Sequence, residues 1–302
     1  MFKSKVKPTL VVSKCLKSGA TGKPQYLTGS DIFNGHVGIP NFLVYPQGID
    51  VDRVEKALVK TLSKYPVLVG RIKKDPQGFQ YIDCSDGGAD FKVFKWKGNM
   101  PKYGVHNPLS KDLDKYYTRF MPWQVVDRDQ ALVNIEVHEF EDGGAIMSLH
   151  GPHTLFDGSS LWNFAADWAK VCHGMDVPQR ACDRDAVIKA AEGQAVQTTG
   201  VPDGLMSDPP MLQRIAKFAK LGIQAISLKK QTFRVPAKQI EAWKQQMQAE
   251  MPGVEGNAVS FVAAHCLKTL SPLMKSSADR VYGIVIDLRF KKGLNIPRDY
   301  VG

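Results

Sequence analysis

Apolar residues recur at helical spacing in the first third of the chain. A stripe of four, from Val51 to Leu62, follows Asp50, a residue type that favours the N-cap, and predicts a helix that begins after Asp50. Pro66 ends this helix, and β-rich runs predict strands over 67–72 and 79–82, joined by a turn that contains proline and glycine. The pattern therefore predicts a hairpin packed on a helix.

The middle of the chain predicts a second hairpin followed by a helix. The runs "ALVNIEVHEF" (131–140) and "GGAIMSLHG" (143–151) are separated by the turn signal "EDGG". Apolar residues then recur at spacings of 3, 4, 7 and 11, which predicts an amphipathic helix that begins near Ser159 or Ser160 and ends at Gly174. The segment between them is a strand-to-helix turn.

The rest of the chain alternates between predicted elements. Four prolines and several glycines lie in 176–230, which we interpret as a long crossover. A strand over 231–235 leads to a helix with Pro236 in its first turn, then to a helix over 259–274 and a strand over 280–290. This alternation predicts the α/β class.

Length and composition fit a soluble globular protein. The chain has 302 residues, of which 43% are hydrophobic, so it can bury a substantial core. No window approaches 18 uninterrupted apolar residues, and the basic N-terminus lacks a long apolar segment. Five scattered cysteines without a C-x-x-C pair indicate reduced thiols rather than a disulfide framework or a thiolate zinc site. We therefore expect a cytoplasmic protein.

Charge changes this picture in one segment. The net charge is +10, and most lysines stand singly among acidic and apolar residues. Between Asp208 and Glu241 there are seven basic residues and no acidic one. This segment is either a solvated basic face or an anion site for a phosphate-bearing ligand.

The strand-to-helix turn carries the candidate chemistry. His153 lies just past the predicted strand end, and a histidine, with an ordinary pKa near about 6.5, can act as a general base at neutral pH. Asp157, four residues on, can cap the helix or orient the histidine. A metal site formed by His150, His153 and Asp157 is a weaker alternative. Another alternative is a purely structural histidine in the turn that hydrogen-bonds to the backbone. No G-x-S-x-G serine motif occurs.

His150 is the nearest rival to His153. It lies near the end of the predicted strand, so we expect a pocket-wall or backbone-bonded histidine. Leu155 and Phe156, inside the turn, are expected in the core or in a channel wall.

The H-x-x-x-D-G of His153, Asp157 and Gly158, after a Gly-Gly hairpin and before an amphipathic helix, resembles the BAHD family of acyl-CoA-dependent acyltransferases. Chloramphenicol acetyltransferases and condensation domains share this motif. Further segments resemble the family in the same order: "LSKYPVLVGRIKKDPQGFQYIDCSDGGADF", "ACDRDAVI" and "VIDLRFKKGLNIPRDYVG".

The resemblance implies an α/β fold of two domains like chloramphenicol acetyltransferase, with mixed sheets flanked by helices and the second domain incomplete. It implies an N-terminal acyltransferase domain over 1–175, a crossover linker over 176–230 and the first part of a second acyltransferase domain over 231–302. It also implies a monomeric enzyme of secondary metabolism.

The same resemblance implies the roles of individual residues. His153 would be the general base that activates an alcohol or amine acceptor for attack on an acyl-CoA thioester. Asp157 would pair with Arg289 from the Asp-x-Arg segment and, with Gly158, form a structural motif. Acyl-CoA would be a co-substrate with no permanently bound cofactor and no metal, and its anionic groups would contact Ser260, Lys229 and Lys230.

One departure from the family stands out. Relatives continue past Gly302 with an Asp-Phe-Gly-Trp-Gly motif that this sequence does not contain. We therefore expect a fragment, completed by a separate C-terminal chain, or a naturally shortened form. Two alternative functions follow: a non-catalytic relative that binds a ligand or partner, and a condensation-type domain that uses carrier-protein thioesters. Nucleic acid and membrane are not expected partners.

Overall fold

The structure is a computed structural model that describes residues 7–35, 38–103, 111–119, 125–192, 234–253, 256–273 and 287–302. The chain divides into two compact units, residues 1–197 with 286–302, and residues 198–285. The last residues thus group with the N-terminal part, although the resemblance assigned all of 231–302 to a second domain. The division into functional domains stays a prediction.

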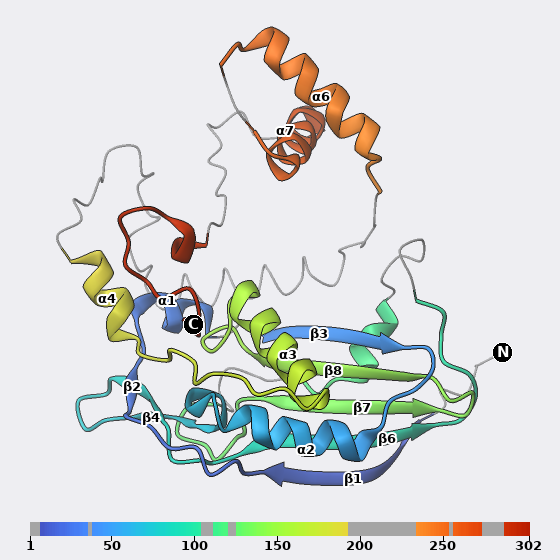
Figure 1. The fold of residues 1–302 in the computed structure, drawn as a ribbon, viewed down its shortest axis with the longest axis vertical. Helices are drawn as coiled ribbons and strands as arrows, with labels where there is room; N and C mark the ends of the chain where they lie inside the picture. The colour runs from blue at the N-terminus through green and yellow to red at the C-terminus, as the bar shows by residue number, and fades with distance from the viewer. Residues whose placement is uncertain are drawn as a thin grey trace. The chain divides into compact units, whose positions relative to one another are not determined.

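The first unit is built on a mixed five-stranded sheet (Figure 1). Its strands are, in spatial order, β1 (Thr9–Leu16), β6 (Ala89–Trp96), β7 (Asn134–Phe140), β8 (Ala145–Pro152) and β3 (Gly38–Tyr45). β6 and β7 run parallel, and the other neighbours are antiparallel. The predicted hairpin of β7 and β8 is confirmed, and its turn places Gly143 at φ +82°, which favours glycine.

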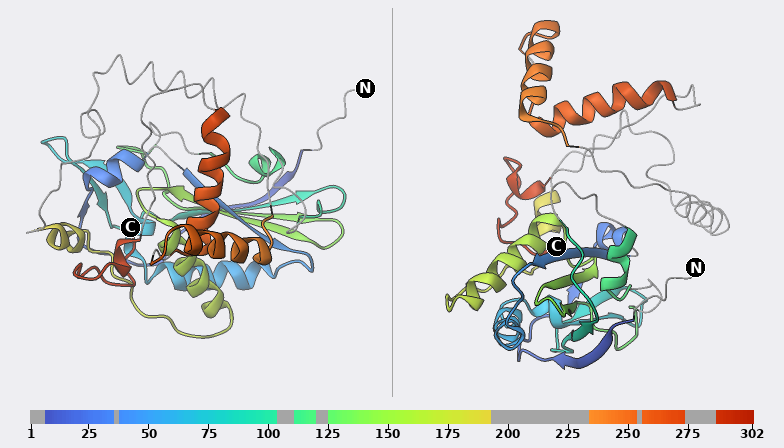
Figure 2. Two further views of the ribbon diagram at one scale, coloured as in Figure 1. Left: turned by 90° about the horizontal axis from the view of Figure 1, so that it is seen from above. Right: turned by 90° about the vertical axis from the view of Figure 1, so that its right-hand side faces the viewer.

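Two helices, α2 (Val51–Leu62) and α3 (Gly158–Cys172), lie side by side over one face of this sheet (Figures 1 and 2). Leu58 and Phe164 from the helices are fully buried in one core with Ile135 of β7. The predicted start of α2 and its cap are confirmed, since Asp50 accepts from the Arg53 N–H at 3.0 Å, and the helix ends at Leu62, before Pro66. The core therefore holds the sheet face against both helices.

The opposite face of the sheet carries a smaller cluster. The ring of Trp96, together with Phe140 and Ile146, packs against a 3₁₀ helix over Lys111–Tyr116. Strands alternate their side chains between the two faces, so the residues between the core positions of β7 and β8 point here. They include Glu136, His138, Ser148 and His150, all buried.

A second, antiparallel sheet consists of β2 (Gln25–Tyr26), β5 (Gln80–Asp83) and β4 (Arg71–Lys74). The strand predicted over 67–72 is partly wrong, because Pro66–Val69 forms a 3₁₀ helix that begins at the proline. A short, fully buried apolar run has no periodicity that distinguishes a strand from a helical turn.

The remaining described helices are α1 (Gly29–Asn34), α4 (Asp185–Ala191), α6 (Ala237–Glu250), α7 (Ala258–Leu270) and two 3₁₀ turns, Ser271–Leu273 and Leu288–Phe290. The strand predicted over 280–290 is wrong where it is described, because the 3₁₀ turn lies there and 280–286 are outside the described residues. Most of the strand predicted over 231–235 also lies outside them.

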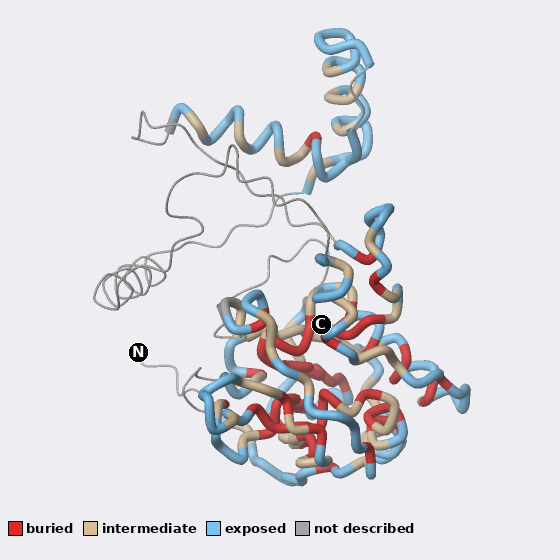
Figure 3. The backbone as a smooth tube through the Cα atoms, turned by 90° about the vertical axis from the view of Figure 1, so that its left-hand side faces the viewer, coloured by how far each residue is buried: buried red, intermediate tan, exposed pale blue. Residues whose placement is uncertain are grey.

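Burial differs sharply between the two units. Buried residues concentrate on the sheet and its two helices in the first unit, whereas α6 has no buried residue and α7 buries only Phe261 (Figure 3). The described part of the second unit therefore has little core of its own.

Candidate active site

The turn of residues 153–157 joins the end of β8 to the start of α3. β8 is completely buried between β7 and β3, so the strand delivers the turn to a fixed place at the rim of the sheet. Leu155 and Phe156 are fully buried in the main core, as the sequence predicted. These two side chains anchor the middle of the turn.

Asp157 begins α3 as its N-cap. Its Oδ1 accepts hydrogen bonds from the N–H and the hydroxyl of Ser160 at 2.8 and 2.7 Å, and the Ser160 hydroxyl accepts from the Asp157 N–H at 2.9 Å. This reciprocal capping box satisfies backbone donors that the first turn of a helix leaves unpaired. The helix begins at Gly158, one or two residues before the predicted start.

The second carboxylate oxygen of Asp157 forms an ion pair with Arg289. Arg289 is buried, and its guanidinium also contacts Asp287 and donates to the Tyr300 carbonyl at 3.1 Å. Asp287 in turn accepts from the Ser159 hydroxyl at 2.6 Å. The structure thus brings together Asp157 and Arg289, which are 132 positions apart in the sequence.

The pKa of Asp287 reflects this surrounding. Burial raises it, but hydrogen bonds from Ser159 and from the Arg289 backbone and side chain lower it more, so the net pKa lies below its ordinary value. The Asp287 carboxylate therefore remains charged and helps to neutralise the buried guanidinium.

His153 occupies the first position of the turn and is half-buried. In the described part of the chain its ring makes no hydrogen bond, and neither carboxylate oxygen of Asp157 contacts it. The residues that follow His153 are held by the core and by hydrogen bonds, whereas His153 itself keeps part of its surface exposed.

His150 lies three residues earlier in a different environment. The residue is 2% exposed, its ring lies tilted at 57° to the Tyr117 ring with the centroids 4.9 Å apart, and it bonds the Thr118 backbone. Burial lowers its pKa to about 4, partly offset by Glu136 and by the Thr118 backbone. His150 is therefore the backbone-bonded, neutral histidine that its strand position predicted.

The remaining predicted site residues are Gly158, which directly follows the turn, and Ser260, Lys229 and Lys230, which are far from it in the sequence. Lys229 and Lys230 are outside the described residues. Ser260 is exposed in the first turn of α7, where its N–H donates to Asn257 Oδ1 at 3.0 Å. Gly158 is exposed, and a Cβ there would meet no described atom within 4 Å. The CoA contacts stay predictions.

Sequence reasoning overlooked one residue at the turn. Arg184 is buried and its Nη2 donates to the Thr154 carbonyl at 2.7 Å, next to His153. The signal was present, because Arg184 belongs to the quoted segment "ACDRDAVI", but nothing in the local pattern indicates what an arginine 30 positions away contacts.

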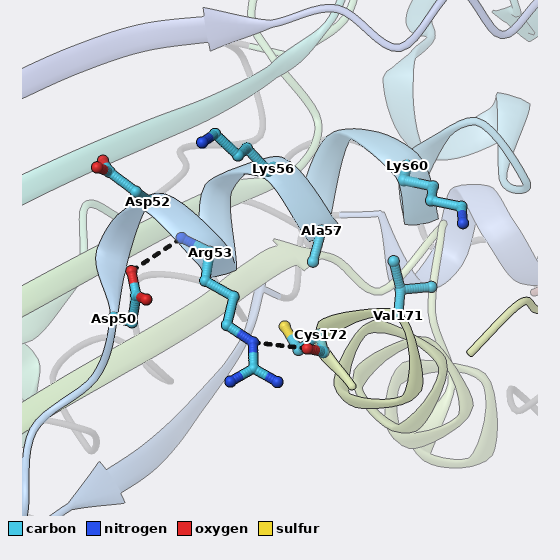
Figure 4. A pocket seen from close by; sticks show the side chains of 8 residues that line it. All are labelled: Asp50, Asp52, Arg53, Lys56, Ala57, Lys60, Val171 and Cys172. Carbon is cyan, nitrogen blue, oxygen red and sulfur yellow. Dashed lines mark hydrogen bonds between the residues drawn. The ribbon is translucent and has the colours of Figure 1, made fainter. Parts of the chain in front are cut away.

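A surface hollow elsewhere is not the candidate site. It lies between α2 and the end of α3 and is lined by Asp50, Asp52, Arg53, Lys56, Ala57, Lys60, Val171 and Cys172 (Figure 4). Its polar groups already serve the helices, since Arg53 Nε donates to the Cys172 carbonyl at 2.6 Å and Lys60 pairs with Asp176 at 2.8 Å. The lining residues do not include His153.

Within the described ranges, no group of three or more His, Cys, Asp or Glu side chains is placed to hold a metal ion. A search of the described helices also finds none with the length and apolar character that a membrane crossing requires.

Comparison with known proteins identifies the family. The sequence profile of the Transferase family matches residues 27–302, which include the whole turn. The chain belongs to this family, that of the BAHD acyltransferases. The resemblance inferred from the motif and its companion segments is thus confirmed.

Individual relatives are distant. Acylsugar acyltransferase 3 from Solanum lycopersicum is 28% identical over 123 residues, which cover 41% of this chain and 28% of that protein. Epi-neemfruitin B synthase L1AT from Melia azedarach is 23% identical over 236 residues, 74% of this chain and 51% of that protein. The matched part of the chain thus spans about half, or less, of the length of these relatives.

The crystal structure of vinorine synthase has the same fold. Its TM-score is 0.61 at 17% identity, and the match covers 98% of this chain and 69% of that chain. The expected α/β acyltransferase architecture, with mixed sheets flanked by helices, is confirmed.

Proposed function

We propose that this protein is an acyltransferase that moves an acyl group from an acyl-CoA thioester to the hydroxyl or amine of a small molecule, with His153 as general base. The observation that carries the proposal is the half-buried His153, which makes no hydrogen bond to the described residues, on a turn whose other residues are buried, capped or ion-paired. Membership of the BAHD acyltransferases supports it.

The chemistry requires one proton carrier and two positioned substrates. The His153 imidazole would take the proton of the acceptor O–H or N–H as that atom attacks the thioester carbonyl. The tetrahedral adduct would expel the CoA thiolate, which regains the proton from the imidazolium. The new ester or amide bond replaces the thioester bond, so no acyl-enzyme and no permanently bound cofactor are needed.

Asp157 would act structurally in this scheme. Its two carboxylate oxygens serve Ser160 and Arg289, so its task is to hold the start of α3 and thereby the turn. Acyl-CoA as co-substrate and its contacts with Ser260, Lys229 and Lys230 are part of the same proposal.

The test measures release of free thiol from acetyl-, malonyl- and hydroxycinnamoyl-CoA in the presence of pooled alcohols and amines. The chain is assayed alone and with a C-terminal part supplied from a family member. We expect His153→Ala to lower kcat/KM by about 10²–10⁴-fold, the usual contribution of a general base. His173→Ala, the same change at an exposed histidine that follows α3, should leave it unchanged.

Each other outcome selects a different function. Equal thiol release by the His153→Ala and parent proteins refutes the assigned base. Absence of release in both arms favours a ligand- or partner-binding relative. Transfer from a carrier protein but not from CoA selects the condensation-type reaction.

A further inference from the structure

Arg184 is a buried cation directly beside the candidate base. Its side chain is 1% exposed, Nη2 donates to the Thr154 carbonyl at 2.7 Å, and Nε donates to Asp31 Oδ2 at 3.3 Å. Its Nη1 has no hydrogen-bond partner among the described residues. Two contacts therefore orient the guanidinium, and one of them is to the residue that follows His153.

Burying a guanidinium costs free energy unless a carboxylate and further acceptors compensate. Asp31 is the described carboxylate that pairs with Arg184, and it is itself held in place. Its Oδ2 accepts from the N–H and hydroxyl of Thr28, both at 2.8 Å, in the capping box of α1. The carboxylate that pairs with the guanidinium is therefore itself held in place by α1, and the guanidinium in turn binds the turn.

The turn and α1 are also joined directly. The Thr154 hydroxyl donates to the Asp31 carbonyl at 3.0 Å, and a Cβ at Gly35 would approach that hydroxyl to 2.8 Å. The Arg184 N–H donates to Gln25 Oε1 at 2.9 Å. Segments around residues 25, 31, 154 and 184 therefore converge on the peptide unit next to His153.

The far end of the turn has its own arginine. Arg289 pairs with Asp157, and the segment that carries Arg289 is bonded to the Arg184 segment, since the Val301 N–H donates to the Ala181 carbonyl at 2.8 Å. Arg184 thus holds the start of the turn and Arg289 holds its end.

We propose that Arg184 is a positioning residue that fixes the backbone next to His153 and thereby the place and orientation of its imidazole. This inference rests on the proposed function of His153 as general base. Arg184 touches no reacting atom, so its loss should act on the step that depends on imidazole geometry. A misplacement of about 1 Å can lower a rate by about 10²-fold.

The decisive variant is Arg184→Lys. Lysine keeps the charge opposite Asp31, but its single ammonium cannot reproduce the planar fork that reaches both Asp31 and the Thr154 carbonyl. The matched control is Arg71→Lys. Arg71 is also buried, pairs with Asp129 and donates to the carbonyls of Gly70, Gly87 and Gly88, none of which belongs to the turn.

Activity is measured with thermal unfolding on the same samples. We expect both lysine variants to lose stability, but only Arg184→Lys to lower kcat, by at least about tenfold with little change in KM. A decrease in kcat no larger than that of Arg71→Lys overturns the proposal. If Arg184→Lys does not fold, Asp31→Asn replaces it, because it removes the charge that orients Arg184 while keeping the size of the side chain.

A second readout does not depend on turnover. The His153 ring signal, assigned by its absence in His153→Gln, is followed by NMR in ¹³C-histidine-labelled protein. We expect it to shift or split in Arg184→Lys and to stay unchanged in Arg71→Lys. An unchanged His153 signal in Arg184→Lys refutes the positioning role. If the His153 signal shifts in Arg184→Lys but the parent protein releases no thiol, the proposed function is refuted and the positioning role is retained.

Discussion

At the scale of single residues, two histidines three positions apart have opposite environments. His150 lies on the face of the sheet opposite α2 and α3 and is 2% exposed, whereas His153 lies past the strand end and is half-buried. The difference follows from the strand, which alternates its side chains until β8 ends at Pro152. Of the two, the histidine outside the strand is the one that the proposed function assigns as general base.

His150 should make stability depend on pH. Burial lowers its pKa from 6.5 to about 4, and groups that face it include Glu136 and Arg119. Between these values the unfolded chain binds the proton that the folded chain does not, so stability is complete above about pH 6.5 and falls as the pH decreases toward 4. The total loss is about 3 kcal/mol.

Urea unfolding at pH 7, 6, 5 and 4.5 measures this dependence. The fall of the unfolding free energy with decreasing pH should be present in the parent protein and in His173→Gln, and it should be reduced in His150→Gln. Identical slopes in all three proteins would show that His150 is not the group responsible.

At the scale of elements, α3 depends on its first residue. Asp157 caps the helix with one oxygen and pairs with Arg289 through the other. Asp157→Asn keeps an oxygen for the Ser160 N–H but removes one of the two carboxylate charges beside Arg289, the other being Asp287. We expect the free energy of unfolding to fall by about 1.5–3 kcal/mol, the usual value of a hydrogen bond to a charged group.

Chemical denaturation tests this with Asp176→Asn as control. Asp176 pairs with Lys60 but is 85% exposed, so solvent screens this pair and its loss should change stability much less than the loss of the Asp157 charge. A fall in Asp157→Asn no greater than in this control would mean that the Arg289 pair contributes little.

At the scale of the whole molecule, the five thiols report the difference in burial along the chain. Burial raises the pKa of Cys84 to about 11 and that of Cys182 to about 12, whereas Cys15 and Cys266 are exposed. The thiolate is the form that reacts, and a thiol of pKa 11 is about 0.1% ionised at pH 8.

We therefore expect iodoacetamide at pH 8 to modify Cys15 and Cys266 first and Cys84 and Cys182 last, as measured by peptide mass spectrometry over time. In about 8 M urea, which should unfold the protein, all five thiols should react at similar rates. Rapid modification of Cys84 in the folded protein would contradict its buried position.

Periodicity and turn chemistry by themselves determined the local elements that carry the candidate site. The start of α2, the β7–β8 hairpin, the buried Leu155 and Phe156, and the strand-to-helix position of His153 follow from patterns within about 15 residues. Where the pattern was ambiguous, at 67–69 and 288–290, strands were predicted and 3₁₀ turns occur.

Only the tertiary structure decided what surrounds the turn. Arg184 and Asp31 converge on Thr154. The pair of Arg289 with Asp157 was predicted from the sequence only through the family resemblance. Contacts between segments 30 or more positions apart leave no periodic trace, because they depend on how β8, α1 and the 181–184 and 287–302 segments pack in space. The sequence therefore shows which chemistry a polar side chain can perform. Its buried partners in the tertiary structure show whether that side chain is held in the position that the chemistry requires.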